Sequence, residues 1–456
     1  MSPWGALSVH ATAGAPRLRA AGVDCEGQDP PAATDRLGPH DLRRFRPVPA
    51  LDETGARAPS PVRGTPETRD TTADATSRLP WAALLVMAFT GFLLITTETM
   101  PAGLLARIAA GLGTSEGTVG QFVSAYALGT ILATVPAIAL TRGLRRKPVF
   151  VVAVTGVLLA NTVTAVSSDV VLSLGARFVA GAFSGLAWAM LAGYARRISP
   201  PTLAGRALSI ASLGTPIGLA VGTPFGAWLG ATHDWRWSFG ILSVLVAVAL
   251  ALTFVLVPDA PGQQAETQLS MARVLGLPSV AAVLVVIVAW MVGHNLLYTY
   301  IGPYLRTAAD GLAVEAALVT FGVAAIVGVA ITGALVDRAL RPLLLASIGL
   351  FGGAGVIMLV GHSSTVAVLF AIVLWGIGYG GAATQLQTAI SNAAGPNADI
   401  ANSLLGVAFN LAILAGGVGG ALLLAAGGLV LPAVMAALAT VALVVAVRAR
   451  RAFPVG

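Results

Sequence analysis

Charge is scarce in this sequence of 456 residues, because Asp, Glu, Lys and Arg make up only 10% of it. A soluble globular protein has about 25% charged residues, so the composition excludes that class. Cysteine is nearly absent, and a single Cys25 excludes an intramolecular disulfide and a cysteine-based metal site. The five histidines are scattered without the spacing of metal ligands, so we expect no metal and no cofactor.

Signatures of catalysis and of ATP use are also missing. The chain has no H-E-x-x-H or C-x-x-C pattern and no Walker loop, so we do not expect an enzyme. An ATP-driven pump would need its nucleotide domain on another chain. No basic patch is interleaved with aromatic residues, so we expect no nucleic-acid partner.

Long apolar runs dominate instead, and hydrophobic residues make up 56% of the chain. A helix with a rise of about 1.5 Å per residue needs about twenty such residues to cross a bilayer core. The sequence predicts an all-α polytopic membrane protein with twelve transmembrane helices. We place them near 80–103, 117–140, 148–167, 169–193, 203–230, 236–257, 278–305, 314–336, 342–361, 363–390, 402–426 and 428–447.

The twelve runs fall into two sets of six, separated by the longest polar break after residue 80. The connection after the second run of each set is basic, at 139–148 and at 333–342, which indicates an internal duplication. We expect two pseudo-symmetric bundles and a linker: 79–257, 258–277 (cytoplasmic) and 278–450.

The charge distribution predicts how the chain is oriented. Residues 1–78 contain ten arginines and ten acidic residues and show no apolar periodicity, so we expect a disordered cytoplasmic tail. The net charge of +7 therefore belongs to the remainder. There, one set of alternating connections holds thirteen basic residues and the other holds three. By the positive-inside rule, both termini lie in the cytoplasm.

Two charged residues lie inside the predicted membrane spans of the first half. Glu98 interrupts the first run in the segment TTETMP, and Arg177 lies about eight residues inside the fourth. Such charges are costly in lipid and mark a proton site, a pathway or a partnered charge. We predict that the two side chains lie close together. Helix counting puts both in the outer part of the membrane, so two alternatives stay open: a solvated Glu98, and an Arg177 that extends outward from a helix end.

Glycine recurs at every fourth residue of the fifth run. The repeat comprises Gly214, Gly218, Gly222 and Gly226, with Pro216 and Pro224 among them. One helix face is thereby left without side chains, which favours close helix packing. The prolines remove backbone hydrogen bonds and bend the helix.

These motifs together resemble the major facilitator superfamily, over about residues 80–450. The basic loop after the second run is similar to the family pattern G-x-L-A-D-R-x-G-R-R, a cytoplasmic latch. Its first copy matches at Arg142, Arg145 and Arg146, but Thr141 replaces the acid and Ala137 the first glycine. The second copy keeps Gly333, Asp337, Arg338 and Arg341. Simple positive-inside charge is the alternative explanation for both copies.

Two further matches favour the twelve-helix drug:proton antiporter type, and in particular chloramphenicol-efflux and arabinose-efflux-permease-like members. Arg177 with Gly181 resembles the helix-four R-x-x-x-G arginine, which the family associates with proton transfer. The glycine repeat resembles the exporter motif G-x-x-x-G-P-x-x-G-G, although Thr223 separates Gly222 from Pro224 and the final double glycine is absent. Ordinary glycine packing remains an alternative.

The resemblance implies a monomeric exporter in a bacterial inner membrane, driven by protons. Glu98 would carry the proton with Arg177 as its partner, and His294 is the reserve candidate. A phenicol-type antibiotic is the first candidate substrate. The alternatives are export of a sugar or metabolite, and a sensor without transport. Polar and aromatic side chains that could line a cavity for a neutral ligand are Tyr126, Trp188, Trp290, Asn295, Tyr298, Gln385 and Asn410.

Overall fold

A computed structural model describes residues 78–141, 143–262, 271–308, 311–450 and 452–453 of the chain. The predicted tail lies outside these ranges apart from Arg78, and so does Arg142 of the first latch. The described residues form helices and connections and contain no β-strand. The predicted all-α polytopic fold is therefore confirmed.

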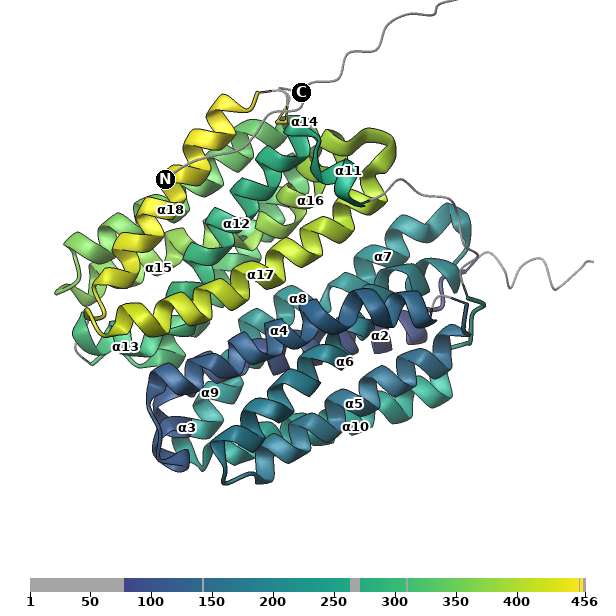
Figure 1. Ribbon diagram of the computed structural model, residues 1–456, viewed down its shortest axis with the longest axis horizontal. Coiled ribbons are helices and arrows are strands. Elements are labelled where there is room, and N and C mark those ends of the chain that lie inside the picture. Colours follow the sequence, from purple (N-terminus) through teal and green to yellow (C-terminus); the bar gives the residue numbers. More distant parts are fainter. Residues whose placement is uncertain (1–77, 142, 263–270, 309–310, 451, 454–456) are drawn as a thin grey trace, which may run out of the picture. The chain divides into compact units, whose positions relative to one another are not determined.

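The first half of the described chain contains the helices before the 258–277 break (Figure 1). They are α2 (Trp81–Gly103), α3 (Leu105–Leu112), α4 (Glu116–Thr141), α5 (Arg146–Val166), α6 (Val170–Arg197), α7 (Ala204–Ser212), α8 (Gly214–Ile217), α9 (Thr223–Thr232) and α10 (Trp235–Leu256). A 3₁₀ turn, η1 (Pro201–Leu203), precedes α7, and a π-helical turn, η2 (Gly218–Gly222), joins α8 to α9.

The second half begins with the short α11 (Met271–Leu275) and repeats the long helices. They are α12 (Pro278–Thr299), α13 (Ile301–Thr307), α14 (Val314–Val360), α15 (Thr365–Gly380), α16 (Ala382–Ala394), α17 (Ala398–Leu424) and α18 (Val430–Arg448). The 3₁₀ turn η3 (Gly395–Asn397) lies between α16 and α17.

Ten helical segments among the described residues are long and apolar enough to cross a membrane. One of them is α14, whose 47 residues would extend about 70 Å, more than twice the bilayer core. Ala339 inside it has non-helical angles (φ −148°, ψ 40°), so α14 consists of two helices joined at a kink. The ten segments do not include the 26-residue α4. The expected twelve crossings therefore depend on this kink and on α4.

Acidic and hydroxyl side chains define where several helices begin. Asp169 accepts a hydrogen bond from the Leu172 N–H (2.7 Å) at the start of α6, and Asp234 accepts one from Arg236 (2.8 Å) at the start of α10. Ser364 caps α15 in the same way. Each side chain satisfies a backbone donor that the first turn of a helix leaves free.

The predicted glycine repeat packs against α2. A Cβ on Gly214 would lie 1.9 Å from the Ala88 carbonyl oxygen, and one on Gly222 would lie 2.1 Å from the Thr96 hydroxyl oxygen. A Cβ on Gly226 would lie 2.6 Å from the Met100 sulfur. The absence of side chains therefore allows the segment α8–η2–α9 to follow α2 along its length, including the turn that carries Glu98.

The two halves meet along α4 and α17, which lie side by side in Figure 1. Near the start of α4, Gln121 donates to the Gly417 carbonyl (3.2 Å), and the Tyr300 hydroxyl donates to the same oxygen (2.7 Å). Glu116 forms an ion pair with Arg306 of the other half at 2.5 Å. The halves are thus joined at the end of the bundle where α4 begins.

Candidate functional site

Arg177 lies on α6 with its side chain fully buried. Its Nη2 donates a hydrogen bond to the carbonyl oxygen of Thr97 at 2.6 Å. Its Nε and Nη1 have no hydrogen-bond partner. The guanidinium lies over the Tyr126 ring, 4.9 Å from its centroid, a geometry in which the ring face stabilises the cation. A buried cation with two free donors is expensive to keep, so the site has donors available for a negative or polar group.

Glu98 is half-buried on α2, one residue after the carbonyl that Arg177 binds. The Glu98 carboxylate interacts electrostatically with Arg177 and Tyr126 of its own half and with Tyr379 of the other half. None of the ion pairs in the described chain joins it to Arg177. The two charges predicted to lie close together therefore share one site, and Arg177 is anchored to the backbone beside Glu98 instead of to its carboxylate.

The helix that carries Glu98 is longer than its apolar run. After the single residue Leu104, α3 continues to Leu112. Counted along both helices, Glu98 lies about 25 Å from Trp81 and about 21 Å from Leu112. The first candidate membrane span, Trp81–Gly103, agrees with the predicted first crossing, and α3 follows it as a separate helix, so the depth of Glu98 stays a prediction.

Neutral hydrogen bonds hold this site in place. Asn161 on α5 donates to the Thr97 hydroxyl at 3.0 Å. The Tyr126 hydroxyl on α4 donates to Ser184 on α6 and to the Leu94 carbonyl (3.4 Å) on α2. Four helices of the first half are thereby tied together around Arg177, which limits the movement of its guanidinium.

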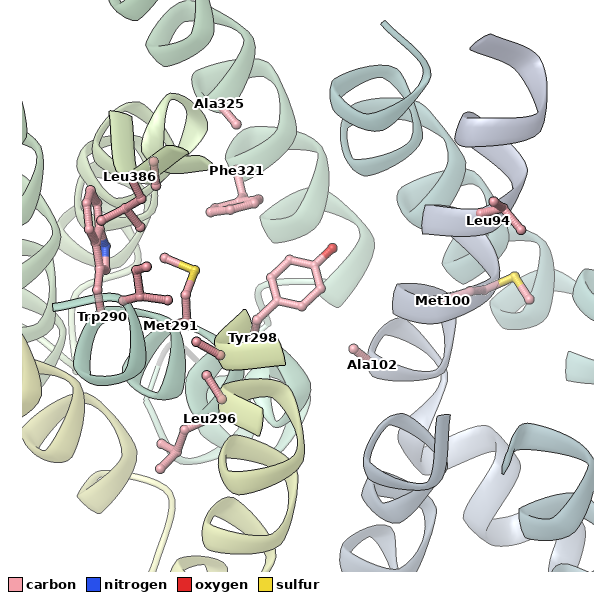
Figure 2. Close-up of a cluster of buried hydrophobic side chains, with 14 of the residues drawn as sticks. Leu94, Met100, Ala102, Trp290, Met291, Leu296, Tyr298, Phe321, Ala325 and Leu386 are labelled. Atoms are coloured by element: carbon pink, nitrogen blue, oxygen red, sulfur yellow. The ribbon is translucent and has the colours of Figure 1, made fainter. Parts of the chain in front are cut away.

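His294 of the second half lies in a cluster of aromatic rings that face α2. Its ring is buried, and it stacks on Tyr379 with centroids 3.5 Å apart and planes 9° from parallel. Trp375 donates from Nε1 to His294 Nδ1 at 3.1 Å. Tyr298 and Phe321 also contact the His294 ring. We use the name aromatic cluster for these five residues: His294, Tyr298, Phe321, Trp375 and Tyr379. Figure 2 shows the Tyr298 ring extending from α12 toward the side where Leu94 and Met100 of α2 lie.

A pair of threonines lies opposite the Tyr298 hydroxyl. The Thr99 and Thr223 hydroxyl groups are 2.6 Å apart, which joins α2 to α9. Tyr298 lies close enough to interact with both, yet its buried hydroxyl forms no hydrogen bond of good geometry. Thr223 is the residue that departs from the family's glycine motif, and here its side chain holds the turn that carries Glu98.

The other predicted cavity residues lie apart from this site. Trp290 is fully buried against Phe351, and its Nε1 has no partner. Gln385 is buried and donates to Thr332 (2.9 Å) and Ser347 (3.0 Å), so it joins helices within the second half.

Two predicted amides bind the backbone of their own helices. Asn295 donates to Met291 and Asn410 donates to Gly406. Trp188 is half-buried, and its ring lies near Gly91 of α2, two turns before Glu98.

Comparison with known proteins identifies the family. The sequence model of the Major Facilitator Superfamily matches residues 87–399, which is more than half of the chain. The chain belongs to the Major Facilitator Superfamily.

Curated relatives within this superfamily are efflux pumps of bacteria. A chloramphenicol efflux pump of Mycobacterium tuberculosis is 31% identical over 375 residues, which cover 78% of this chain and 90% of the relative. The purine ribonucleoside efflux pump NepI of Salmonella typhimurium is 29% identical over 393 residues, covering 83% of this chain and 96% of the relative. The family thus indicates a multi-pass bacterial membrane transporter of small molecules, with efflux as the shared activity of these relatives.

The superfamily latch is built differently from the sequence expectation. In the first copy, Arg145 forms an ion pair with Asp259 at 2.6 Å, and the Lys147 backbone N–H donates to the same carboxylate at 3.0 Å. Arg146 is buried, and its backbone N–H donates to Ala260 at 2.9 Å. Asp259, which follows α10, therefore supplies the carboxylate that is missing at Thr141.

The second latch copy does not form an Asp–Arg contact. Asp337 and Arg338 are exposed, and none of the ion pairs in the described ranges includes either residue. Arg341 next to the kink is buried and donates to the carbonyls of Val447 and Phe453, both at 2.9 Å. This arginine therefore holds the end of α18 against α14.

Sequence reasoning missed Tyr379, Trp375 and Asp259, which the structure places in the aromatic cluster and beside the first latch. Tyr379 and Trp375 belong to the run WGIGYGG, and a Cβ on Gly380 would lie 2.0 Å from the Ala325 carbonyl oxygen. The density of glycine around two aromatic residues was a usable signal, because it predicts close packing of α15 on α14. Asp259 carried no such signal, since a single acid in a polar linker is common.

Proposed function

We propose that this transporter exports a small uncharged or weakly polar molecule in exchange for protons. The observation that carries the proposal is the half-buried Glu98 beside the fully buried Arg177, which has two unpartnered donors. The free energy of ionising a carboxyl group inside a membrane protein depends on the polarity and charge around it. A conformational change that alters these surroundings is therefore coupled to protonation of Glu98.

Glu98 acts as the proton carrier in this scheme, and Arg177 as the fixed charge beside it. When Glu98 is ionised, the free Nε–H and Nη1–H groups of Arg177 favour the negative charge nearby. Protonation removes this attraction and leaves Arg177 bound to the Thr97 carbonyl alone. The change in charge weakens the tie between α2 and α6 and permits the two halves to rock against each other.

We assign the joined end of the bundle to the outer side of the membrane, with both termini in the cytoplasm. The thirteen-to-three distribution of basic residues supports this orientation. Glu116, Gln121, Tyr300 and Arg306 then close the outer end, and the substrate enters from the cytoplasm. Protons move inward as the substrate moves outward.

Chloramphenicol is the first substrate to test, and purine ribonucleosides are the second. The named relatives support both. The two compound classes share a planar aromatic ring and hydroxyl groups and carry no charge at neutral pH. A site with one carboxylate and one counter-charge suits such neutral molecules better than ions.

Transport by the purified full chain in liposomes tests this proposal. With chloramphenicol or adenosine present, an imposed pH gradient should drive accumulation in the wild type and not in Glu98→Gln. Glu315→Gln, a half-buried carboxylate in the first turn of α14, is the matched control and should keep pH-driven transport. Accumulation that persists in Glu98→Gln would remove Glu98 as the carrier, and no proton movement with any substrate would favour a non-transporting sensor.

A further inference from the structure

The aromatic cluster of the second half has no part in the proton exchange proposed above. His294 lies at its centre, with ring centroids at 5.2 Å from Tyr298, 5.5 Å from Trp375 and 5.7 Å from Phe321. Trp375 and Phe321 also contact each other at 4.7 Å. Five rings from α12, α14 and α15 thus form one cluster, and its Tyr298 ring extends toward α2 (Figure 2).

The hydrogen bond from Trp375 determines how His294 is held. Nδ1 accepts the Trp375 N–H, so the neutral ring carries its own proton on Nε2. A proton on Nδ1 would place two N–H groups opposite each other at this distance. His294 is therefore fixed as a neutral, oriented ring, and this argues against its reserve role as a proton carrier.

Tyr379 differs from its neighbours because it is half-buried while the other four rings are buried. One face of Tyr379 stacks on His294, nearly parallel and 3.5 Å away. Tyr379 is also near enough to Glu98 of the first half for the two groups to interact electrostatically. A rigid aromatic ring that is stacked on one face and only partly buried can accept a second planar ring by stacking.

We propose that Tyr379, supported by His294, is a stacking platform for a planar, uncharged aromatic ring of the transported molecule. This inference rests on the proposed export function, and it names the class of molecule exported as one that contains such a ring. We expect a neutral ligand, because the Arg177 guanidinium is held at the Thr97 carbonyl, next to Glu98, as its counter-charge. A cationic ligand would meet the Arg177 cation, which is fully buried and cannot move away into water.

Ring-selective binding tests the platform, using 4-nitrobenzyl alcohol and cyclohexylmethanol as probes. The two probes are neutral alcohols, and only the first has an aromatic ring. Binding to the full chain in lipid nanodiscs is measured by saturation-transfer NMR, with empty nanodiscs to subtract partition into lipid. We expect Tyr379→Leu to weaken binding of the aromatic probe by about three- to tenfold and to leave cyclohexylmethanol unchanged.

Two further variants separate stacking from a general structural role. Tyr379→Phe keeps the ring and should bind the aromatic probe within about twofold of the wild type. Phe370→Leu removes a ring from the same helix α15, where the side chain is 55% exposed, and should have no effect. His294→Leu removes the ring that stacks on Tyr379. It should weaken binding of the aromatic probe and leave binding of cyclohexylmethanol unchanged.

The outcomes that overturn the platform are equally specific. The platform is wrong if the wild type does not bind 4-nitrobenzyl alcohol. It is also wrong if Tyr379→Leu loses binding of both probes equally, or if that variant binds the aromatic probe as well as the wild type does. A failure of the proton scheme would show in a different measurement, the liposome assay, as pH-driven transport that persists in Glu98→Gln. Ring-selective binding with such a result would leave the platform standing and overturn only the proton carrier.

Discussion

Arg177 donates to the backbone carbonyl of Thr97 at 2.6 Å, one residue before the acid that it would be expected to neutralise. This arrangement keeps the cation beside Glu98 whatever the charge of the carboxylate, because a carbonyl oxygen accepts the hydrogen bond in both states. The guanidinium has five N–H donors, so one can anchor it while others remain available.

Replacement of Arg177 should separate its anchoring from its charge. Arg177→Met removes both, and we expect pH-driven accumulation in liposomes to fall by at least about tenfold. Arg177→Lys keeps the charge but lacks the planar, multiple-donor head, so we expect partial activity. Arg107→Met, which replaces an exposed arginine of α3, should transport normally. Equal activity of Arg177→Met and wild type would contradict the role.

The glycine repeat makes a prediction about stability. A Cβ on Gly222 would lie 2.1 Å from the Thr96 hydroxyl oxygen, so Gly222→Ala must push α2 and η2 apart. Such overpacking costs about 1–3 kcal/mol, which should lower the thermal unfolding midpoint in detergent by several degrees. Gly193→Ala on α6 has no atom within 4 Å of the added Cβ and should melt like the wild type. An unchanged midpoint for Gly222→Ala would show that the packing is loose.

Asp259 should make stability depend on pH at the acidic end. Partial burial of its carboxyl would raise its pKa, but hydrogen bonds from the Lys147 and Ala260 N–H groups, with the Arg145 guanidinium nearby, outweigh this and hold the pKa below its ordinary value of 3.8. The sign follows directly. The stabilisation is fully present above the unfolded-state pKa and is lost as the pH falls through the lower folded-state pKa.

The variant Asp259→Asn measures this contribution. We expect it to unfold more easily than the wild type at pH 7 by less than about 1 kcal/mol, because Arg145 is largely exposed and solvent screens the pair. The difference should disappear as the pH falls below the ordinary carboxyl range. Thermal melts of both proteins between neutral and acidic pH provide the test, and a difference that grows toward acid would contradict it.

The ion pair between Glu116 and Arg306 should bias the conformational equilibrium. It joins the two halves at the end where α4 begins, and the Arg306 side chain is 57% exposed, so its worth is at most about 1 kcal/mol. Removing the pair with Glu116→Gln should shift spin-label distances across this end toward longer values. The charge swap Glu116→Arg with Arg306→Glu should restore the shorter distances.

Tyr300→Phe tests the neutral part of the same closure. It deletes the hydrogen bond to Gly417 and should shift the distances in the same direction as Glu116→Gln. Unchanged distances in both variants would mean that other contacts hold this end closed.

Much of the architecture followed from local chemistry that the sequence alone displays. Apolar runs of about twenty residues predict crossings because an unpaired backbone group in lipid is costly and a helix satisfies its own. The four-residue glycine spacing predicted a close helix contact for the same kind of local reason. The sequence did not predict which helix the glycine repeat contacts. Nothing in the repeat indicates that its partner is α2, the helix that carries Glu98.

The sequence by itself determined the membrane class, the all-α fold and the two residues, Glu98 and Arg177, whose burial demands an explanation. Only the tertiary structure decided that Arg177 binds the Thr97 carbonyl, that Asp259 takes the place of the acid missing at Thr141, and that Tyr379 stacks on His294. The physical reason is the separation along the chain of the residues that each effect involves. Helix formation and burial in lipid depend on neighbours along the chain, whereas these contacts join residues 80 or more positions apart, and their partners are set by how the helices pack.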